Sequence, residues 1–230
     1  MGDVTVDQRG LASSLAAGID ALGLSLSEAQ QQQLLGYMGL IQKWNKVYNL
    51  TALRDPQEML THHLLDSLSA IAPLMQHLQG LPSFEATGCA LLDVGSGGGL
   101  PGVVIGICCP KVRVTCVDAV SKKAAFVQQV AASLKLPNLK GVHARVETLT
   151  GPFDVVCSRA FAALPDFVTW SANALTDASV WMAMKGKLPT EEMAALPSIA
   201  TVFHVEQLQV PGLDAERCMI WMKKSPTSVV

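Results

Sequence analysis

A glycine-rich segment from Asp93 to Gly102 is the part of this sequence best suited to hold a ligand. It reads Asp-Val-Gly-Ser-Gly-Gly-Gly-Leu-Pro-Gly and lies between an apolar run at residues 90–94 and a helix expected at residues 101–109. Glycines permit positive φ and let backbone amides approach a ligand closely. From Gly97 onward the segment fits G-x-G-x-x-G, which alone does not separate NAD, FAD and S-adenosylmethionine. A glycine-rich turn without a ligand is the alternative.

An acidic residue marks the end of the next expected strand, residues 112–117. Asp118 lies 19 residues after Gly99. In doubly wound α/β folds, a carboxylate at this place accepts hydrogen bonds from the ribose hydroxyls of an adenine nucleotide. The spacing favours such a ligand, with an ordinary acid at a strand end as the alternative.

Further candidates for cofactor binding follow the third expected strand, residues 141–144. Arg145, Val146 and Glu147 stand there in sequence. In methyltransferases the loop at this position borders the adenine ring, which makes Val146 and Glu147 candidate cofactor contacts. The alternative is a solvated charge pair.

Basic side chains follow the next two expected strands, residues 153–157 and 180–184. Arg159 follows the first of them, two residues before Phe161. Ligands of open α/β sheets bind beyond the carboxyl ends of the strands. We therefore expect Arg159 near the transferring group or an acceptor phosphate, with a structural salt bridge as the alternative. The further candidate phosphate contacts are Lys122, Lys123, Lys185 and Lys187.

Strands and helices must alternate to bring these strand ends together. From residue 90 onward, seven expected strands alternate with helices, which predicts an α/β fold with a mostly parallel, Rossmann-like sheet covered on both faces. The last two strands, residues 201–208 and 217–222, are expected to pair as an antiparallel hairpin. Residues 1–88 read as a helical extension packed on the sheet, and residues 89–230 as the domain that carries the strand ends.

Apolar residues at spacings of three and four predict that the first 88 residues are helical. They are Leu34, Tyr37, Met38, Ile41, Trp44 and Tyr48. Ser25 and Glu28 fit a capping box, so we expect this helix to begin just after Ser25. Trp44 and Tyr48 are expected in the core.

Length, composition and charge exclude several classes of protein. The chain has 230 residues, of which 50% are hydrophobic and 16% charged, and its formal net charge is −2. It can bury a sizeable core, and it has neither the composition of a disordered chain nor that of a strongly basic nucleic-acid coat. Residues 89–230 hold 13 basic and 11 acidic residues, against 4 and 8 in residues 1–88, so an anion-binding face is expected in the second part.

Several observations bear on the compartment and on metals. No apolar stretch approaches the ~20 residues that a membrane span needs, and the N-terminus lacks the pattern of a signal peptide. The six cysteines contain no C-x-x-C pair, which favours buried, reduced thiols. We expect a cytoplasmic monomer without a membrane partner. His63 and Asp66 share a helix face, but two such residues do not make a metal site, so no metal is expected.

Short motifs throughout the chain resemble those of one known family. They are Lys-Trp-Asn at residues 43–45, Tyr-Asn-Leu-Thr at 48–51, Arg-Asp-Pro at 54–56, His-Leu-Leu-Asp-Ser at 63–67, the glycine-rich segment, Ser-Arg-Ala-Phe at 158–161, Lys-Gly at 185–186, Leu-Gln-Val-Pro at 208–211 and Glu-Arg at 216–217. Over roughly residues 20–224, they resemble the ribosomal RNA small-subunit methyltransferase G family, also called glucose-inhibited division protein B. The order of the N-terminal motifs is the most specific part of the resemblance.

The resemblance implies a Rossmann-like class I S-adenosylmethionine methyltransferase that acts on 16S rRNA of the small ribosomal subunit. The acceptor would be N7 of guanine 527, in the decoding-region loop. The residues that correspond to the family's cofactor contacts are Gly95, Leu100, Val146, Glu147 and Arg159, with Asp118 as the acid on the ribose side. We add Gly97 and Gly99 of the same loop. Gly98 stands where some relatives have Pro. This difference makes the loop more flexible but removes no contact to the cofactor.

The chemistry of that reaction fits the residue types. Guanine N7 carries a free lone pair at neutral pH, so methyl transfer from a sulfonium needs no general base, and we expect none. Positioning of the two reactants can supply ~7–11 kcal/mol of the barrier. Because a stacked base hides N7 from such a pocket, we expect a flipped or looped-out guanine, with Phe161 as its candidate stacking surface. Core packing of Phe161 is the alternative.

Three other functions compete with this interpretation. A dinucleotide oxidoreductase shares the glycine loop and the acid, but it needs a catalytic residue near the nicotinamide, and both tyrosines lie in the N-terminal helices. A small-molecule methyltransferase usually needs a lid or acceptor pocket, for which little chain remains. A cofactor-binding assembly protein would retain S-adenosylmethionine without transferring its methyl group.

Overall fold

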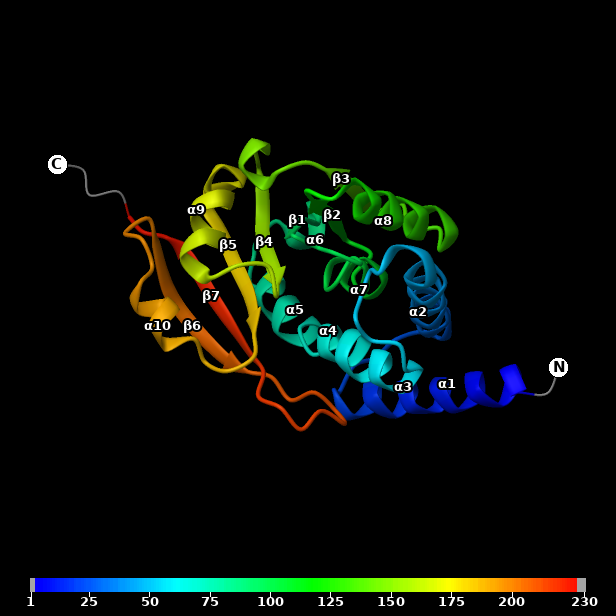
Figure 1. Cartoon of the computed structure of the whole chain (residues 1–230). Coiled ribbons are helices and arrows are strands. Elements are labelled where there is room, and N and C mark those ends of the chain that lie inside the picture. Colours follow the sequence, from blue (N-terminus) through cyan, green and yellow to red (C-terminus); the bar gives the residue numbers. More distant parts are fainter. Residues whose placement is uncertain (1–2, 227–230) are drawn as a thin grey trace.

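A seven-stranded sheet forms the centre of the molecule (Figure 1). The computed structural model describes the backbone of residues 3–226 and the side chains of residues 9–226. The first two residues of the N-terminus, which lacks the pattern of a signal peptide, lie outside the described residues. The strands are β1 (Cys89–Val94), β2 (Val112–Asp118), β3 (Leu139–His143), β4 (Phe153–Arg159), β5 (Leu175–Lys185), β6 (Ala200–Gln207) and β7 (Cys218–Lys224).

The strand order is β3-β2-β1-β4-β5-β7-β6. Strands β1 to β5 pair in parallel, and β7 is antiparallel to both β5 and β6. The predicted seven-stranded, mostly parallel sheet and its closing antiparallel pair are therefore confirmed.

Helices cover both faces of this sheet. They are α1 (Asp3–Ala21), α2 (Glu28–Tyr48), α3 (Pro56–Met59), a π-helical segment (Leu60–Leu65), α4 (Asp66–Leu68), α5 (Ile71–Gln79), α6 (Phe84–Thr87), α7 (Gly102–Cys108), α8 (Ser121–Ser133), α9 (Leu164–Ser171) and α10 (Thr190–Ala194), with 3-10 turns at Val146–Thr148 and Ala172–Ala174. Helices α1 to α8 share a hydrophobic core with one sheet face, and α9 and α10 pack on the other. Within residues 3–226, no helix combines the length and apolar character that crossing a bilayer requires.

Alternation along the strands explains why the sheet has two cores. In β1, Leu91 faces the core of α1 to α8, whereas Leu92 and Val94 face the core of α9. A parallel strand that is buried on both faces reads as a continuous apolar run, which is the pattern of this segment. Asp93 interrupts the run and is fully buried, so it needs a polar partner.

Helix α2 begins later than its sequence predicts. Its N-cap is Ser27, which forms a capping box with Gln30, so the expected start at Ser25 is wrong. Both serines fit the local pattern, but the Gln30 amide also donates to the Ile107 and Cys108 carbonyls at the end of α7, and this contact favours the later start.

The apolar face of α2 is buried as its spacing predicts over its first part, whereas Trp44 is only partly buried against the core and Tyr48 is exposed. Leu34, Tyr37, Met38 and Ile41 are buried, but Tyr48 is 41% exposed. The expectation that Tyr48 is core is wrong because α2 ends there, at a left-handed Asn49.

The strand order changes direction at β1, and this change creates the site. The chain runs outward from β1 through β2 to β3, then returns to place β4 on the other side of β1. In open α/β sheets, ligands bind in the crevice beyond the carboxyl ends of two such strands. The glycine loop leaves β1 and Ala160 leaves β4, so both lie at this crevice.

Candidate functional site

The loop after β1 depends on its glycines. Gly95, Gly97 and Gly99 have φ values of 64°, 58° and 91°, in the region that other residues rarely adopt. A Cβ on Gly95 would also lie 2.0 Å from Cδ2 of Phe161, whereas a Cβ on Gly98 would meet nothing within 4 Å. The loop conformation therefore explains why glycine stands at positions 95, 97 and 99, but it does not explain the glycine at position 98.

Buried polar groups from two other elements hold this loop. Tyr37 of α2 is buried, and its hydroxyl donates to the carbonyl oxygen of Gly98 at 2.5 Å. Asp93 accepts the backbone N–H of Gly102 at 2.8 Å. Burial raises the pKa of Asp93 to about 7 and raises the pKa of Tyr37 well above its ordinary value. The loop is thus fixed from the α2 side and at the start of α7.

Asp118 ends β2 beside the glycine loop. Its Oδ2 accepts the N–H of Gly97 at 3.0 Å, and its Oδ1 accepts the N–H of Val120 at 2.8 Å. The ammonium of Lys123 lies 3.8 Å from Oδ2. Because each carboxylate oxygen can accept more than one hydrogen bond, Asp118 retains capacity for a ligand.

A cavity of about 410 Å³ lies beyond the ends of β1, β2 and β4. Asp118 and Glu147 contribute carboxylates to its wall, while Val146, Phe161 and Trp170 contribute apolar surface. The rings of Phe161 and Trp170 meet edge to face, with centroids 5.9 Å apart. This arrangement suits a nucleoside, because the apolar walls can enclose a flat ring and a carboxylate can accept hydrogen bonds from the sugar hydroxyls. We call it the first cavity.

The second cavity, of about 220 Å³, continues along the glycine loop. It is lined by Ile41, Leu50, Thr51, His63, residues 95–98, Leu100, Lys123, Arg159 and Ala160. Gly95, Lys123 and Ala160 line both cavities. The two cavities together offer carboxylates at one end, and loop amides with an arginine at the other. This donor and acceptor set fits S-adenosylmethionine, which joins a nucleoside to an amino acid.

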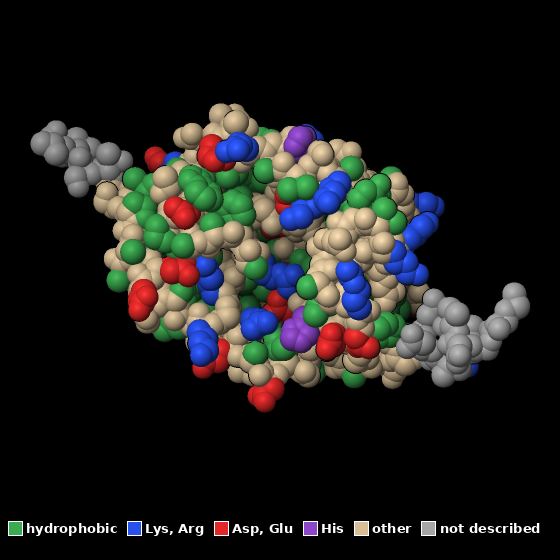
Figure 2. Space-filling view, viewed as in Figure 1, with side chains coloured by type: hydrophobic (Ala, Val, Ile, Leu, Met, Phe, Trp, Pro, Cys, Tyr) green, Lys and Arg blue, Asp and Glu red, His purple; other side chains and the backbone are tan. Residues whose placement is uncertain are grey.

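Arg159 separates the second cavity from a third, of about 320 Å³. Its Nη1 donates to Oδ2 of Asp66 at 2.5 Å, and Nε of Arg217 donates to Oδ1 of the same carboxylate at 2.7 Å. The Asp66 side chain is only 4% exposed. Figure 2 shows a hollow near the middle of this view, with basic and acidic side chains inside and around it. The third cavity is thus basic, although the whole chain is slightly acidic.

His63 lies between the second and third cavities and lines both. Burial, followed by the nearby charge of Arg159, lowers its pKa to about 4. Its Nε2 shares a hydrogen bond of 2.8 Å with Oγ1 of Thr51. The ring is therefore neutral at pH 7.

Most of the predicted site residues gather at these cavities. Those that line them are Gly95, Gly97, Leu100, Asp118, Lys123, Val146, Glu147, Arg159, Phe161 and Lys185. Phe161 lines only the first cavity, and Lys185 only the third. Gly99 lies behind the loop, where a Cβ would be 2.4 Å from Cγ2 of Val103. Lys122 and Lys187 are exposed and line none of the three.

Several residues of the site were not predicted from the sequence. They are Tyr37, His63, Asp66, Trp170 and Arg217. The sequence around Asp66 could have indicated its role, because an acid between the leucines of residues 64–68 is expected to be buried and to need a polar partner. That partner could not be identified locally, because Arg217 is 151 residues away. Within the described residues, no three His, Cys, Asp or Glu side chains are grouped so that they could hold a metal ion.

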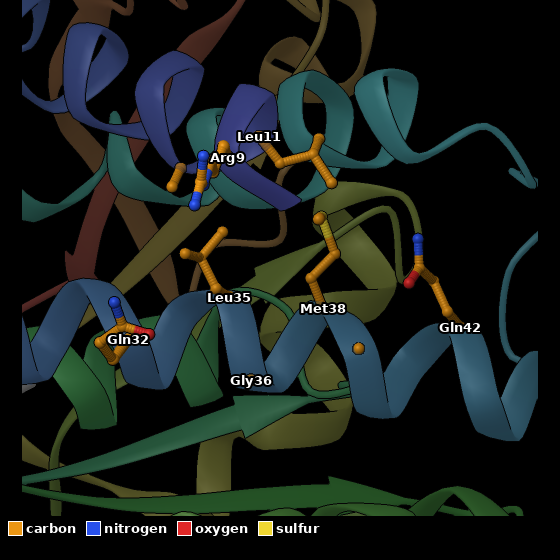
Figure 3. Close-up of a pocket in the computed structure, with 9 residues that line it drawn as sticks. Arg9, Leu11, Gln32, Leu35, Gly36, Met38 and Gln42 are labelled. Carbon is orange, nitrogen blue, oxygen red and sulfur yellow. The ribbon is translucent and has the colours of Figure 1, made fainter. Parts of the chain in front are cut away.

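A larger cavity, of about 580 Å³, lies between α1 and α2 (Figure 3). Leu11 of α1 and Leu35 and Met38 of α2 point into it, with Arg9 as the charged side chain in its lining. None of its lining residues belongs to a strand end or to the glycine loop. This cavity therefore lacks the residues that could bind the expected ligand, despite its size. The candidate site is the set of cavities at the strand ends.

Comparisons with known proteins show the family of this chain. A family model described as rRNA small subunit methyltransferase G (GidB) matches residues 30–220. The chain belongs to this family. The resemblance of its motifs to the rRNA small subunit methyltransferase G family is thereby confirmed. A methyltransferase of this family uses S-adenosylmethionine, and the first two cavities fit that cofactor.

Individual members of the rRNA small subunit methyltransferase G family are similar to this chain over nearly its full length. A relative with the family's name from Paracidovorax citrulli is 64% identical over 225 residues, which cover 96% of this chain and 93% of the relative. Another, from a Polaromonas species, is 65% identical over 215 residues, or 94% of each chain. A solved SAM-dependent methyltransferase from Aquifex aeolicus has a TM-score of 0.54 at 16% identity and covers 76% of this chain and 97% of that one. Such low identity shows only the fold, which is the predicted Rossmann-like methyltransferase fold.

Proposed function

We propose that this chain transfers a methyl group from S-adenosylmethionine to N7 of guanine 527 in 16S rRNA. The observation that carries the proposal is the continuity of the three cavities at the strand ends, all of which Ala160 lines. The names of the curated relatives support small-subunit rRNA as the acceptor class. The choice of guanine N7 rests on the resemblance of the motifs and on the chemistry of the site.

The cofactor supplies an electrophilic methyl group on a positively charged sulfur. In our proposal Asp118 accepts hydrogen bonds from the ribose hydroxyls, as carboxylates at this place do in doubly wound folds. Val146 and Glu147 lie at the adenine. Arg159 and the amides of the glycine loop hold the methionine carboxylate, because such amides form a cradle for anionic groups.

Transfer to N7 requires positioning and no proton removal. The N7 lone pair is available at neutral pH, so the protein needs only to hold N7 in line with the methyl group and close to it. Positioning of this kind supplies ~7–11 kcal/mol of a barrier. With a pKa of about 4, His63 is a poor base at pH 7, which agrees with a reaction that needs none.

The acceptor is proposed to lie on the side of Arg159 that faces the third cavity. Lys185 lines this cavity. Lys123 lines the first two cavities, and the exposed Lys122 and Lys187 are the more peripheral candidate phosphate contacts. Phe161 lies over Gly95 in the first cavity, so its position suits the adenine of the cofactor better than a flipped guanine. Its role as a stacking surface for guanine stays a prediction.

The setting of the reaction is also a proposal. We infer a cytoplasmic monomer that works on the small ribosomal subunit. The six cysteines are all free, and five of them are buried, which agrees with a reducing compartment. The modest net charge of −2 agrees with a small RNA footprint.

The proposal is tested with labelled S-adenosylmethionine and small ribosomal subunits from a strain that lacks this modification. We expect label to enter 16S rRNA with the wild-type protein, and much less label with a Gly95→Ala variant. Cofactor binding without transfer to rRNA would contradict the acceptor class. Absence of cofactor binding would contradict the assignment of the glycine loop.

A further inference from the structure

The third cavity carries more positive charge than the proposed cofactor needs. Arg159, Lys185 and Arg217 line it as cations, and Asp66 lines it as a carboxylate, so its charged lining sums to +2. A basic cavity in a chain with a net charge of −2 is a local feature. A cavity lined by fixed charges of one sign raises the local concentration of ions of the other sign, in this case anions.

Asp66 holds two of these cations in fixed positions. Each of its oxygens accepts from a different arginine, Arg159 at the end of β4 and Arg217 just before β7. Arg159 also donates to the carbonyl of His62 at 2.9 Å, and Arg217 to the carbonyl of Glu216 at 2.8 Å. Both guanidinium groups are therefore fixed by two partners each.

The arginines keep donors for a ligand. Their hydrogen bonds use Nη1 of Arg159, and Nε and Nη1 of Arg217, whereas a guanidinium carries five N–H donors. Within residues 9–226, the Nη2 group of neither arginine has a hydrogen-bond partner. The Arg159 and Arg217 side chains are 18% and 23% exposed, so these donors are sheltered but accessible.

Stability alone does not explain this cluster. Burying ions costs solvation, and well-packed apolar residues in place of a buried ion pair are often neutral or stabilising. Two arginines around one carboxylate leave one positive charge without a protein partner, and the +2 of the whole lining exceeds the single negative charge of the cofactor carboxylate assigned to Arg159. A planar guanidinium held in one orientation matches the bidentate geometry of phosphate. The arrangement is therefore better explained by an anionic ligand than by folding.

We propose that the third cavity binds a backbone phosphate of the substrate RNA next to the target guanine, with Arg217 as its main contact and Asp66 as a positioning residue. This inference rests on the proposed function. His63, Arg159 and Ala160 line both the second and third cavities, so a phosphate in the third lies beside a base placed at the methyl group. Lys185 also lines this cavity and adds positive charge, although it pairs with Glu192 at 2.8 Å.

The first test is an Arg217→Gln variant of the full chain with small ribosomal subunits as substrate. One lost charge-assisted contact should raise KM for the subunit about tenfold or more. The slope of log affinity against log salt should fall by about 0.7–0.9. The Kd for S-adenosylmethionine should stay within about twofold, which also reports that the variant is folded. Arg113→Gln is the matched control, because Arg113 is an exposed arginine near the start of β2, at the opposite end of the sheet.

The second test leaves the protein unchanged, so it does not depend on the folding of a variant. Subunits reconstituted from 16S rRNA with an uncharged methylphosphonate beside the target guanine should bind the wild-type protein about tenfold more weakly. They should bind Arg217→Gln with little further loss. If inorganic phosphate competes with the subunit at constant ionic strength while the methylphosphonate has no effect, the cavity binds free anions and the proposal is wrong.

The failure of this inference is distinguishable from the failure of the proposed function. If the wild-type protein methylates its subunit, and Arg217→Gln does so with unchanged KM and salt slope, only the phosphate site is overturned. If Arg217→Gln weakens binding of the subunit and lowers the salt slope as predicted, but the wild-type protein transfers no methyl group, the proposed function fails and the phosphate site stands.

Discussion

Two neighbouring glycines of the same loop should differ in what they tolerate. Gly95 has positive φ, and a Cβ there would meet the ring of Phe161 at 2.0 Å, whereas Gly98 has neither constraint. Left-handed backbone costs other residues roughly 1–2 kcal/mol before any clash. We expect Gly95→Ala to raise the Kd for S-adenosylmethionine more than tenfold, and Gly98→Ala to change it less than twofold. Calorimetric titration of both variants checks this, and equal effects would contradict the loop geometry.

Two ionisable residues, the buried Asp93 and the partly buried His63, give the folded chain opposing pH dependences. The pKa of Asp93 is raised to about 7, so between pH 4 and 7 the folded state keeps a proton that the unfolded state releases, and stability falls as pH rises. The pKa of His63 is lowered to about 4, so between pH 4 and 6.5 the unfolded state binds a proton that the folded state lacks, and stability rises with pH. The two contributions partly cancel in the wild-type protein.

Asp93→Asn should expose the contribution of His63. The Asn amide oxygen can still accept the N–H of Gly102, so the fold is expected to persist. The free energy of unfolding in urea should then rise more steeply from pH 5 to 6.5 than in the wild-type protein. His63→Gln should produce the reverse, a steeper fall. Profiles parallel to that of the wild-type protein would mean that these pKa shifts are absent.

At the scale of elements, helix α2 supports the proposed cofactor site although it lies far from the glycine loop in sequence. Tyr37 reaches the loop carbonyl of Gly98, and Gln33 of the same helix donates to the carbonyl of Leu134 at the end of α8. We expect Tyr37→Phe and Gln33→Leu each to lower the free energy of unfolding by about 1 kcal/mol. Only Tyr37→Phe should also weaken S-adenosylmethionine binding, by about threefold to tenfold. Equal cofactor affinity in the two variants would remove Tyr37 from the site.

Elements with strong local patterns were predictable from the sequence. The apolar runs of β1 and β2, the glycine loop between β1 and α7, and the acid at Asp118 all follow from residue types and spacing. Contacts between distant segments were not predictable. Asp66 pairs with Arg217 across 151 residues, and Tyr37 reaches Gly98 across 61. Such pairings depend on how elements pack, which local spacing does not encode, and the same tertiary effect selects Ser27 over Ser25 at the start of α2.

At the scale of the whole molecule, one hydrophobic core joins the N-terminal helices to the sheet. Tyr37 and Leu64 belong to the same cluster as Leu91 and Val155. The division into residues 1–88 and 89–230 therefore stays a proposal about function. We expect residues 89–230 alone to lack cooperative thermal unfolding, because they would expose one face of the sheet. Circular dichroism checks this, and a truncated chain that unfolds cooperatively and binds the cofactor would show that the helices are dispensable.

The central claim is that the strand-end site methylates N7 of one guanine. The most direct measurement is to treat hypomethylated small subunits with the protein and S-adenosylmethionine, then reduce the rRNA and cleave it with aniline, which cuts the strand at 7-methylguanosine. We predict one new cut, at guanine 527, which depends on the cofactor and is lost with Gly95→Ala. Methyl label in the rRNA without a cut at that guanine would contradict the account.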